Sequence, residues 1–518
     1  MKMKKSKWID NFKEFVETGS YKRAVDYFTK DFHIAFSSPR LNEMYNIALK
    51  IPDQYYNTVF SKLLLGWLCF ICGNNKKVTE IFTGINESQL KTIDEKSTFY
   101  ALKSMAISVA SQGESLKYAK LAVDILPKDY ESIIAGNAYM TYGRKLTNVK
   151  KYRQGAKYFE RGYEIFRRLH SNFLAVNCFV SQCLNLYALG ECEDVIKRCQ
   201  QILLNNSSKN LEMDPFMNII KLPMGMCYYE MNKINLAIKA LDEARVAIVN
   251  MKLVHMHGLM EMYLFNCYIK KNDRKNAEKI VETLQSIFEN LNHPQINYII
   301  RAMKVKCAIH FNEKLKNEWV EELELAYQLS PKSIPTFILE ALIELKLNKY
   351  SEVITKDILI DKLEELQFIG HTPEIQGISL YLAELFYNDK KIDICKAHLK
   401  NACDIYLEYG MFSQFINRDL SCLSYVKDLD KSLSKKLFKD NKGKNVSTPS
   451  QDNMIEKLTN RELEVLRLVS KGKTNKEISD ALFISIGTTK WHVNNIFGKL
   501  SVSKRFDAIS KAKELNLV

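Results

Sequence analysis

Apolar positions recur with the period of an amphipathic helix along residues 1–426, and short polar turns interrupt them at regular distances. A typical unit has an apolar helix, a turn, and a second helix with a small residue near its start. Gly225, Tyr228, Ala237, Leu241 and Ala244 mark one such unit. Small residues at these positions let two helices approach closely, while large apolar side chains fill the space to the next pair. The pattern predicts a succession of helical hairpins.

These hairpins repeat at a period of roughly 40 residues. The anchor residues of the second helices are Ala156, Val195, Ala237, Ala277, Trp319, Val353 and Cys395, with looser anchors earlier at Ala24, Val78 and Ala119. The pattern resembles the tetratricopeptide repeat, although most units are longer than its standard length of about 34 residues. That resemblance implies an α-superhelix of about ten hairpins, whose concave face binds a small molecule, a peptide or a protein. No residue pattern identifies this ligand.

The pattern of capping and apolar residues in the C-terminal residues 454–518 predicts four short helices. Thr459–Glu462 and Thr474–Glu477 are capping boxes, in which threonine and glutamate side chains satisfy each other's backbone N–H groups. Ser485 is a third expected N-cap, after a short turn. The positions expected to face inward are Leu463, Leu466, Val469, Ile478, Ala481, Leu482, Val493, Ile496, Phe497 and Leu500.

The third of these helices has a polar and basic outer face. Its outward residues are Gly487, Thr488, Trp491, Asn494 and Asn495, with Lys490 and Lys499 at the edges. A short helix, a tight turn and a second helix with such a face form the helix-turn-helix arrangement. The second helix fits the major groove, where lysine and asparagine bind base edges. A small bundle used for protein contacts would not need this face.

Residues 458–515 resemble the LuxR-type DNA-binding domain nearly end to end. The matching positions are Leu458, Thr459, Arg461, Glu462, Glu464, Val465, Leu466, Gly472, Asn475, Lys476, Glu477, Ile478, Leu482, Ile484, Ser485, Thr488, Lys490, His492, Asn495, Ile496, Lys499, Leu500, Val502, Arg505 and Ala508. The resemblance implies base contacts by Lys490, Trp491 and Asn494. It implies phosphate contacts by Thr474, Asn475, Lys476, Thr488 and Lys499. It places dimer contacts on the last helix, at Arg505, Ala508, Ile509 and Ala512.

Two residues depart from the family pattern. Thr489 replaces the usual valine at an inward-facing position, so its hydroxyl needs a partner in the preceding turn. Trp491 is large for a groove-facing position and changes which base contacts are expected. We expect the domain to bind double-stranded DNA as a homodimer on two half-sites.

The net charge of +15 supports an anionic partner, and more than half of the excess lies in the last 93 residues. Residues 427–453 are rich in Lys, Asn, Ser and Gly and are predicted to be a flexible basic linker. Its lysines either form a solvated surface or add attraction to a polyanion. No apolar run reaches the roughly 18 residues of a membrane span, and no export signal precedes the helical part. We therefore expect a cytoplasmic protein without membrane contact, with its 12 cysteines as reduced thiols.

Glycine (19) and proline (10) are scarce, which favours helices joined by short turns over β architectures. The predicted fold is all-α: a helical repeat in residues 1–426, the linker, and a helix-turn-helix domain in residues 454–518. The combination resembles the MalT-like group of bacterial transcription regulators. That group has an N-terminal nucleotide-binding module, whereas this sequence begins in the helical part, so ATP-driven assembly is not expected.

Catalytic motifs are not evident in the sequence. Gly472-Lys473-Thr474 resembles the end of a phosphate-binding loop, but Arg467 stands where that loop needs glycine. Cys69 and Cys72 have a zinc-like spacing without a second ligand pair. We expect no enzyme activity, no cofactor and no metal. The sequence-based interpretation is a DNA-binding regulator controlled by a ligand or partner; the alternatives are a repeat scaffold that acts by protein contacts and, more remotely, a repeat-fold phosphatase.

Overall fold

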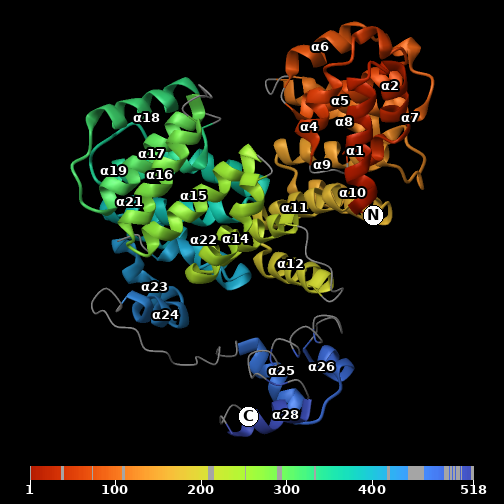
Figure 1. Cartoon of the computed structure of the whole chain (residues 1–518). Coiled ribbons are helices and arrows are strands. Elements are labelled where there is room, and N and C mark those ends of the chain that lie inside the picture. The colour runs from red at the N-terminus through yellow and green to blue at the C-terminus, as the bar shows by residue number, and fades with distance from the viewer. Residues whose placement is uncertain are drawn as a thin grey trace. The chain divides into compact units, whose positions relative to one another are not determined.

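The computed structural model describes the whole chain except residues 1, 37–39, 73, 108–110, 208–214, 251–252, 289–293, 332–333, 417–419, 442–459, 483–488, 490–492, 494–495, 497–501, 503–504 and 515–518. The described residues form helices and turns, and no strand occurs among them. The predicted all-α fold is confirmed. The chain divides into two compact units, Met1–Asn441 and Lys442–Val518 (Figure 1).

The first unit is a long series of helices. In chain order these are α1 (Lys2–Glu17), α2 (Tyr21–Lys30), α3 (Phe32–Phe36), α4 (Leu41–Ala48), η1 (Asp53–Tyr55), α5 (Val59–Ile71), α6 (Asn75–Thr83), η2 (Glu87–Gln89), α7 (Ile93–Ala106), α8 (Gln112–Asp124), α9 (Ile133–Asn148), α10 (Tyr152–Arg168), α11 (Asn172–Ala188) and α12 (Cys192–Ser207). The series continues with η4 (Pro215–Ile220), α13 (Lys221–Glu230), α14 (Ile234–Asn250), α15 (Val254–Lys270), α16 (Arg274–Phe288), α17 (Pro294–His310), α18 (Asn317–Leu329), α19 (Thr336–Leu347), α20 (Lys356–Ile369), α21 (Thr372–Asn388) and α22 (Ile392–Tyr409). It ends with η5 (Ser413–Phe415), η6 (Ser421–Tyr425), α23 (Val426–Leu429) and α24 (Lys431–Asn441).

The helices of this unit pack as a repeat. From α5 onward, the odd-numbered helices contact one another in sequence: α5 packs on α7, α7 on α9, and so on to α21. The even-numbered helices up to α18 pack on the odd-numbered helices before and after them. Helices α20 and α22 both pack on α21. Because the odd-numbered helices lie closer to each other, the array curves with these helices on its concave side. The predicted succession of helical hairpins is confirmed.

The turn after each odd-numbered helix from α9 to α21 contains one residue in the left-handed conformation. These residues are Lys150, Gly190, Asn232, Asn272, Asn312, Lys349 and Lys390, with φ between 54° and 85°. In each turn, the next backbone N–H donates to the carbonyl five positions earlier, as from Lys391 to Phe386 at 2.9 Å. This Schellman geometry satisfies the free carbonyls at the end of the helix. Three of these residues are asparagines, which tolerate this conformation and recur every 40 residues.

Most of the predicted anchor residues lie where the period placed them. Ala237, Ala277 and Cys395 are early in α14, α16 and α22 and are completely buried. Trp319 lies early in α18 and is half-buried. Val353 is an exception, because it lies in the turn before α20, whose N-cap is Thr355. The irregular spacing on either side of Val353 in the sequence, 34 and 42 residues, reflects this misplaced anchor.

The repeat array also makes contacts between hairpins that are distant in the sequence. The Lys150 ammonium, after α9, lies 2.6 Å from the Glu365 carboxylate of α20. Gly190 is so close to α21 and α22 that a Cβ atom there would lie 2.9 Å from both Thr372 and Tyr409. The α11–α12 turn is therefore packed directly against the α21–α22 hairpin. Curvature has brought hairpins five repeats apart into contact.

Helix α24 lies inside the range expected to be a linker. Leu433 and Leu437 of α24 are buried in the large core of the first unit, and Asp430 caps the helix by accepting from the Leu433 amide at 2.7 Å. Two leucines four residues apart give this lysine-rich helix one apolar stripe. The lysine-rich composition of residues 427–441 thus predicted a linker where an amphipathic helix packs on the core. The first unit extends to Asn441.

The second unit contains α25 (Asn460–Ser470), α26 (Asn475–Leu482) and α28 (Arg505–Glu514). A small core joins them to further buried residues; its members are Val465, Leu466, Val469, Ile478, Val493, Ile496, Ala508 and Ala512. This separate core explains why the unit is compact by itself. Across the part of the chain that the structure describes, no helix has the length and apolarity needed to cross a membrane.

Candidate nucleic-acid interface and ligand cavity

Helix α26 begins with the predicted capping box. The Thr474 amide donates to Glu477 Oε2 at 2.8 Å, and the Glu477 amide donates to Thr474 Oγ1 at 3.3 Å. The Thr474 hydroxyl also donates to Glu477 Oε2 at 3.0 Å. Two backbone N–H groups that the helix leaves free are thereby satisfied. The box fixes where α26 starts and how the turn before it approaches.

The Glu477 carboxylate is held in its charged form. Its pKa falls to about 2, first because the Thr474 amide donates to it, and then because the Lys473 ammonium lies 3.0 Å away. A carboxylate in the first turn also interacts favourably with the helix dipole. Glu477 therefore remains negative at physiological pH and keeps Lys473 beside the N-terminus of α26.

Arg505 connects the turn before α26 to α28. Its guanidinium donates to the Lys473 carbonyl and lies 3.5 Å from Asn475 Oδ1. Arg505 was expected at a dimer contact, and Asn475 at a phosphate. In the structure both are half-buried and in contact with each other within one unit. Lys476, in contrast, is exposed, and its ammonium has no ion pair among the described residues.

The inward face of the second unit agrees with most of the sequence analysis. Thr489 and Ile496 are fully buried and Val493 is nearly so. Ala481 was expected inside but is exposed, whereas Ser479 is buried and its hydroxyl donates to the Lys476 carbonyl at 2.6 Å. Along a helix, position 479 lies 100° from Ile478 on the side of Leu482, and position 481 lies on the opposite side. The side chains that face the core are therefore those of Ile478, Ser479 and Leu482.

The four residues predicted for a dimer helix lie on α28. Ala508 and Ala512 are fully buried in the core of their own unit, and Ile509 packs against that core. Their side chains pack within their own unit. The residues predicted to contact bases and phosphates include several that lie outside the described residues: Lys490, Trp491, Asn494, Thr488 and Lys499.

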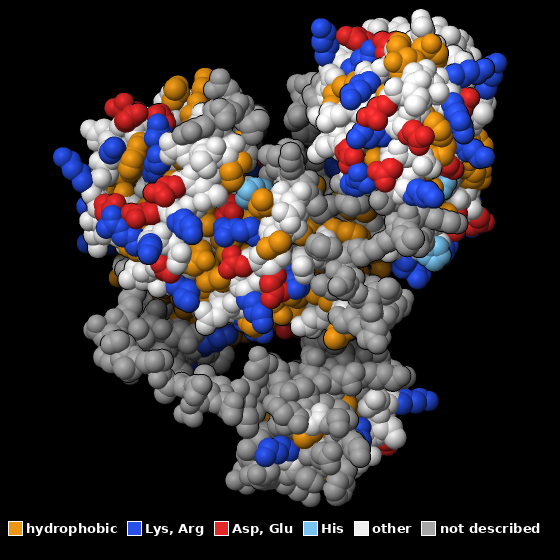
Figure 2. All heavy atoms as spheres, in the orientation of Figure 1, with side chains coloured by type: hydrophobic (Ala, Val, Ile, Leu, Met, Phe, Trp, Pro, Cys, Tyr) orange, Lys and Arg blue, Asp and Glu red, His pale blue; other side chains and the backbone are white. Residues whose placement is uncertain are grey.

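On the face of the first unit (Met1–Asn441) that Figure 2 shows, positive and negative side chains are interspersed. Lysine, arginine, aspartate and glutamate side chains are mixed over it, with apolar side chains between them. In this unit, oppositely charged side chains pair across helices, such as Arg301 with Glu322 and Lys356 with Asp389. A surface of mixed sign offers no focused potential to a polyanion.

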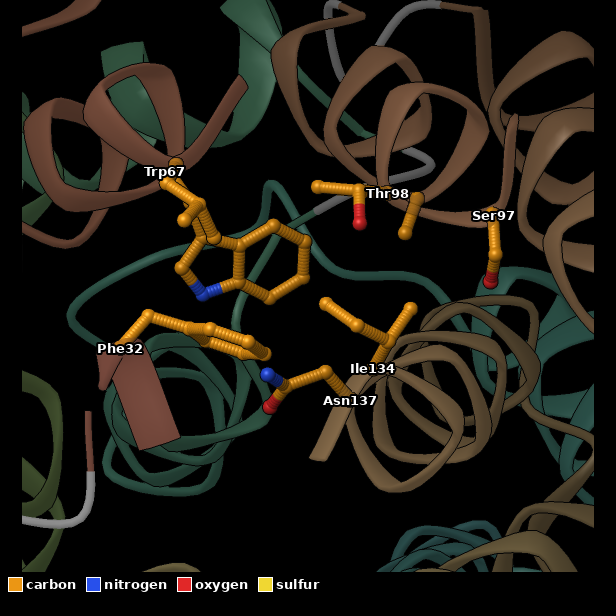
Figure 3. A pocket seen from close by; sticks show the side chains of 8 residues that line it. Phe32, Trp67, Ser97, Thr98, Ile134 and Asn137 are labelled. Carbon is orange, nitrogen blue, oxygen red and sulfur yellow. The ribbon is translucent and has the colours of Figure 1, made fainter. Parts of the chain in front are cut away.

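A cavity of about 440 Å³ lies among the odd-numbered helices α11 to α21 and is bordered by η5. Its wall combines aromatic and apolar side chains with a few charged ones, among them Glu230, Lys270 and Glu340. This size and mixture are typical of small-molecule sites. A second cavity, of about 10 Å³, lies between Phe32, Trp67, Thr98 and Asn137 (Figure 3). It has room for about one water molecule, so the larger cavity is the candidate ligand site.

Residues 456–512 match the family model described as bacterial regulatory proteins, luxR family. The second unit carries a luxR-family domain. The luxR-family domain includes both α25 and the capped α26, as well as Arg505, Ala508 and Ala512 of α28.

Curated relatives match a short part of the chain. The transcriptional regulatory protein LiaR of Bacillus subtilis is 54% identical over 63 residues, which are 12% of this chain and 30% of LiaR. The response regulator protein VraR of Staphylococcus aureus is 46% identical over 65 residues, 12% of this chain and 31% of VraR. The chain thus spans less than a third of the length of these relatives.

Two solved structures are similar to the helical unit at low identity. One is a Rap protein complexed with competence and sporulation factor, with a TM-score of 0.44 and 10% identity over 76% of this chain and 99% of that chain. The other is a signal transduction ATPase with numerous domains and a tetratricopeptide repeat sensor, from Pyrococcus horikoshii. Its TM-score is 0.44, with 15% identity over 66% of this chain and 51% of that chain.

Proposed function

We propose that this protein is a DNA-binding regulator of transcription, whose luxR-family domain reads a major-groove site and whose helical repeat unit receives the controlling ligand. The observation that carries the proposal is the luxR-family match, together with the capping box and core that build α26. DNA on the chromosome is the partner, so the protein acts in the cytoplasm.

The base contacts are assigned to Lys490, Trp491 and Asn494. Thr489, Val493 and Ile496 are helical and buried, so they define which side of that helix meets the core. On a helix with this phase, positions 491 and 494 are expected on the opposite side, where a major groove is accessible. Lysine and asparagine at such positions bind base edges, and the tryptophan ring contacts a thymine methyl group.

The phosphate contacts are assigned to the N-terminus of α26 and to the ends of the reading helix. Free N–H groups and the helix dipole attract phosphate at such an N-terminus. Lys476 is exposed there and available, and Thr474 and Asn475 are beside it. Thr488 and Lys499 are expected to contact the backbone on either side of the groove.

A homodimer on two half-sites is the proposed specific complex, because one domain offers only a modest contact area. Ala508 and Ala512 are excluded from its contact by their burial, which leaves the outward side of α28, next to Ile509. The ligand site is assigned to the cavity of about 440 Å³ among the odd-numbered helices. Ligand binding would change how two domains are presented to DNA.

The test is selection of fragmented genomic DNA by the full-length protein at about 0.15 M salt, where non-specific phosphate binding is weak. Enrichment of a short two-fold symmetric site supports the proposal and identifies the target genes. The control is the full-length Lys490→Ala variant, which should lose the enrichment while keeping salt-sensitive bulk binding. Bulk binding alone by the unsubstituted protein would contradict the proposal and favour a scaffold that acts through protein contacts.

A further inference from the structure

We propose that the large cavity of the helical unit binds its ligand through a protonated amine, which pairs with the carboxylate of Glu230. The inference names the chemistry of the ligand and rests on the proposed function for its regulatory role. Binding itself depends only on the cavity, so the two ideas can fail separately.

The charge of the cavity is opposite to that of the protein. Its wall contains four carboxylates, those of Glu230, Glu340, Glu344 and Glu374, against the two ammonium groups of Lys270 and Lys306. The formal balance is two negative charges when all are ionised, in a chain of net charge +15. A concave site with a net negative charge attracts a cation more strongly than an anion. The cavity therefore favours a cation.

Glu230 is the carboxylate with an unused acceptor. It lies at the end of α13 and is 2% exposed. Its Oε1 accepts a hydrogen bond from the Tyr187 hydroxyl at 2.8 Å, and the Tyr263 hydroxyl lies 2.5 Å from that of Tyr187. Because Tyr187 has one proton to donate, Tyr263 donates to Tyr187. Glu230 Oε2 has no hydrogen-bond partner in the described part of the chain, which is costly for a buried carboxylate.

The two lysines at the wall are held by other groups. The Lys270 ammonium donates to the Ser413 carbonyl at 2.7 Å and lies over the Tyr229 ring. The Lys306 ammonium pairs with Glu340 at 2.9 Å and lies 3.5 Å from Glu344. These contacts fix both cations in the wall. An incoming ammonium group would supply the hydrogen bond that Glu230 Oε2 lacks.

The surroundings of Glu230 also suit an organic cation. The rings of Tyr187 and Tyr229 each meet the Tyr263 ring edge to face, at centroid distances of 6.2 and 5.5 Å. Aromatic faces attract ammonium groups, and more strongly where water is excluded. Met226 and Met262, also in the wall, are adaptable apolar surfaces for the body of the ligand.

Release of a proton on ligand binding would report the contact between the ammonium group and the Glu230 carboxylate. Burial raises the pKa of Glu230 to about 7, against the Tyr187 hydrogen bond and the charge of Lys270, while Glu340 raises it further. A side-chain contact from Gln414 also lowers this pKa. At pH 7 about half of the empty sites therefore carry a proton on Glu230. A bound cation stabilises the carboxylate, so binding should release about half a proton.

The experiment uses three probes of one shape and different charge: benzylammonium, benzyl alcohol and benzoate. Their affinities for the full-length protein are measured by ligand-observed NMR and calorimetry at pH 7. We expect benzylammonium to bind at least tenfold more tightly than the other two. Calorimetry in buffers of different ionisation enthalpy should report about half a proton released per bound cation.

Three variants keep the result interpretable. Glu230→Gln should remove the preference for benzylammonium and the proton release. Tyr187→Phe removes the donor to Oε1 and the acceptor for the Tyr263 hydroxyl but keeps the ring and Oε2. It should keep the preference, which excludes general damage near the cavity. Glu364→Gln removes an exposed charge of α20 outside the cavity wall and should change nothing. Failure of all three probes to bind, equal binding of benzoate, or an unchanged preference in Glu230→Gln would overturn the proposal.

An ammonium group has two sources, a free amine or the amino terminus of a peptide. A random hexapeptide pool with free amino termini, compared with its acetylated form, separates the two sources. If the protein retains only the peptides with free amino termini, the ligand is a peptide. If it retains neither form, the ligand is a free amine. Genomic DNA selection with and without benzylammonium tests the link to regulation. Amine binding without DNA selection would reject the proposed function alone, and DNA selection without amine preference would reject this inference alone.

Discussion

The backbone amide of Phe412 donates a 2.8 Å hydrogen bond to the backbone carbonyl of Glu230. Phe412 follows α22, whereas Glu230 ends α13, so the hydrogen bond joins hairpins that are four repeats apart. The adjacent Ser413 accepts from Lys270 of α15. Together these contacts bring η5 to the cavity wall beside the Glu230 carboxylate. The candidate ligand site thus depends on the closure of the array as well as on the repeats themselves.

A substitution at Gly190 tests how much the contact between distant hairpins stabilises the array. Alanine there would adopt a strained conformation at φ +85° and would place Cβ 2.9 Å from Thr372 and Tyr409. Backbone strain of about 1 kcal/mol and overpacking of about 2 kcal/mol predict that Gly190→Ala lowers the free energy of unfolding by about 3 kcal/mol. The measurement is urea unfolding followed by circular dichroism.

Gly19→Ala is the matched control for that substitution. Gly19 has a similar φ of +70°, but nothing lies within 4 Å of the Cβ position. Only the backbone strain of about 1 kcal/mol is therefore expected. Equal losses in the two variants would mean that the packing of Gly190 against α21 and α22 contributes nothing.

Thr474→Ala should destabilise α26. The substitution removes the acceptor for the Glu477 amide and the hydroxyl that donates to the Glu477 carboxylate. Loss of an N-cap threonine costs about 1 kcal/mol, which corresponds to faster hydrogen exchange of the α26 amides by about fivefold. Thr474→Ser retains the hydroxyl and should exchange like the unsubstituted protein. Similar exchange in the alanine variant would exclude a stabilising role for the box.

The same box predicts a dependence on acidity. The pKa of Glu477 is lowered to about 2, mainly by the Thr474 amide, from an unfolded value near 4.3. A lowered pKa stabilises the folded form above the unfolded value, and this contribution is lost as the pH falls from about 4.3 through about 2. Titration of the Glu477 carboxyl signal by NMR should give a midpoint near 2. A midpoint above 4 would contradict the hydrogen bonds described for Thr474.

Two lysine substitutions should separate phosphate contacts from base contacts. Lys476 is exposed at the start of α26, so Lys476→Ala should weaken binding to all DNA sequences about equally and lower the salt slope by about one unit. Lys490→Ala should instead cost about 1–3 kcal/mol on the preferred site and relax the choice of base. Affinities for selected and scrambled duplexes over a salt series give both quantities. Equal loss of discrimination in both variants would refute the assignment.

Local features of this protein were readable in the sequence because they depend on neighbouring residues. The hydroxyl of Thr474 and the carboxylate of Glu477 are three positions apart, and that spacing alone defines a capping box. Burial of Leu466, Val469 and Ile478 likewise follows from helical periodicity. The asparagine turns after α13, α15 and α17 belong to the same class, because each depends on one residue that tolerates positive φ.

The sequence by itself determined the helical repeat, the capped α26 and the luxR-family domain, because each follows from periodic or short-range patterns. Only the tertiary structure decided which side chains remain available. It placed Ala508 and Ala512 in the core of their own unit and packed α24 where composition indicated a linker. It also brought Phe412 to Glu230 and left one oxygen of a buried carboxylate unpaired. The contact between Phe412 and Glu230 depends on the curvature accumulated over many repeats, and no window of the sequence contains that curvature.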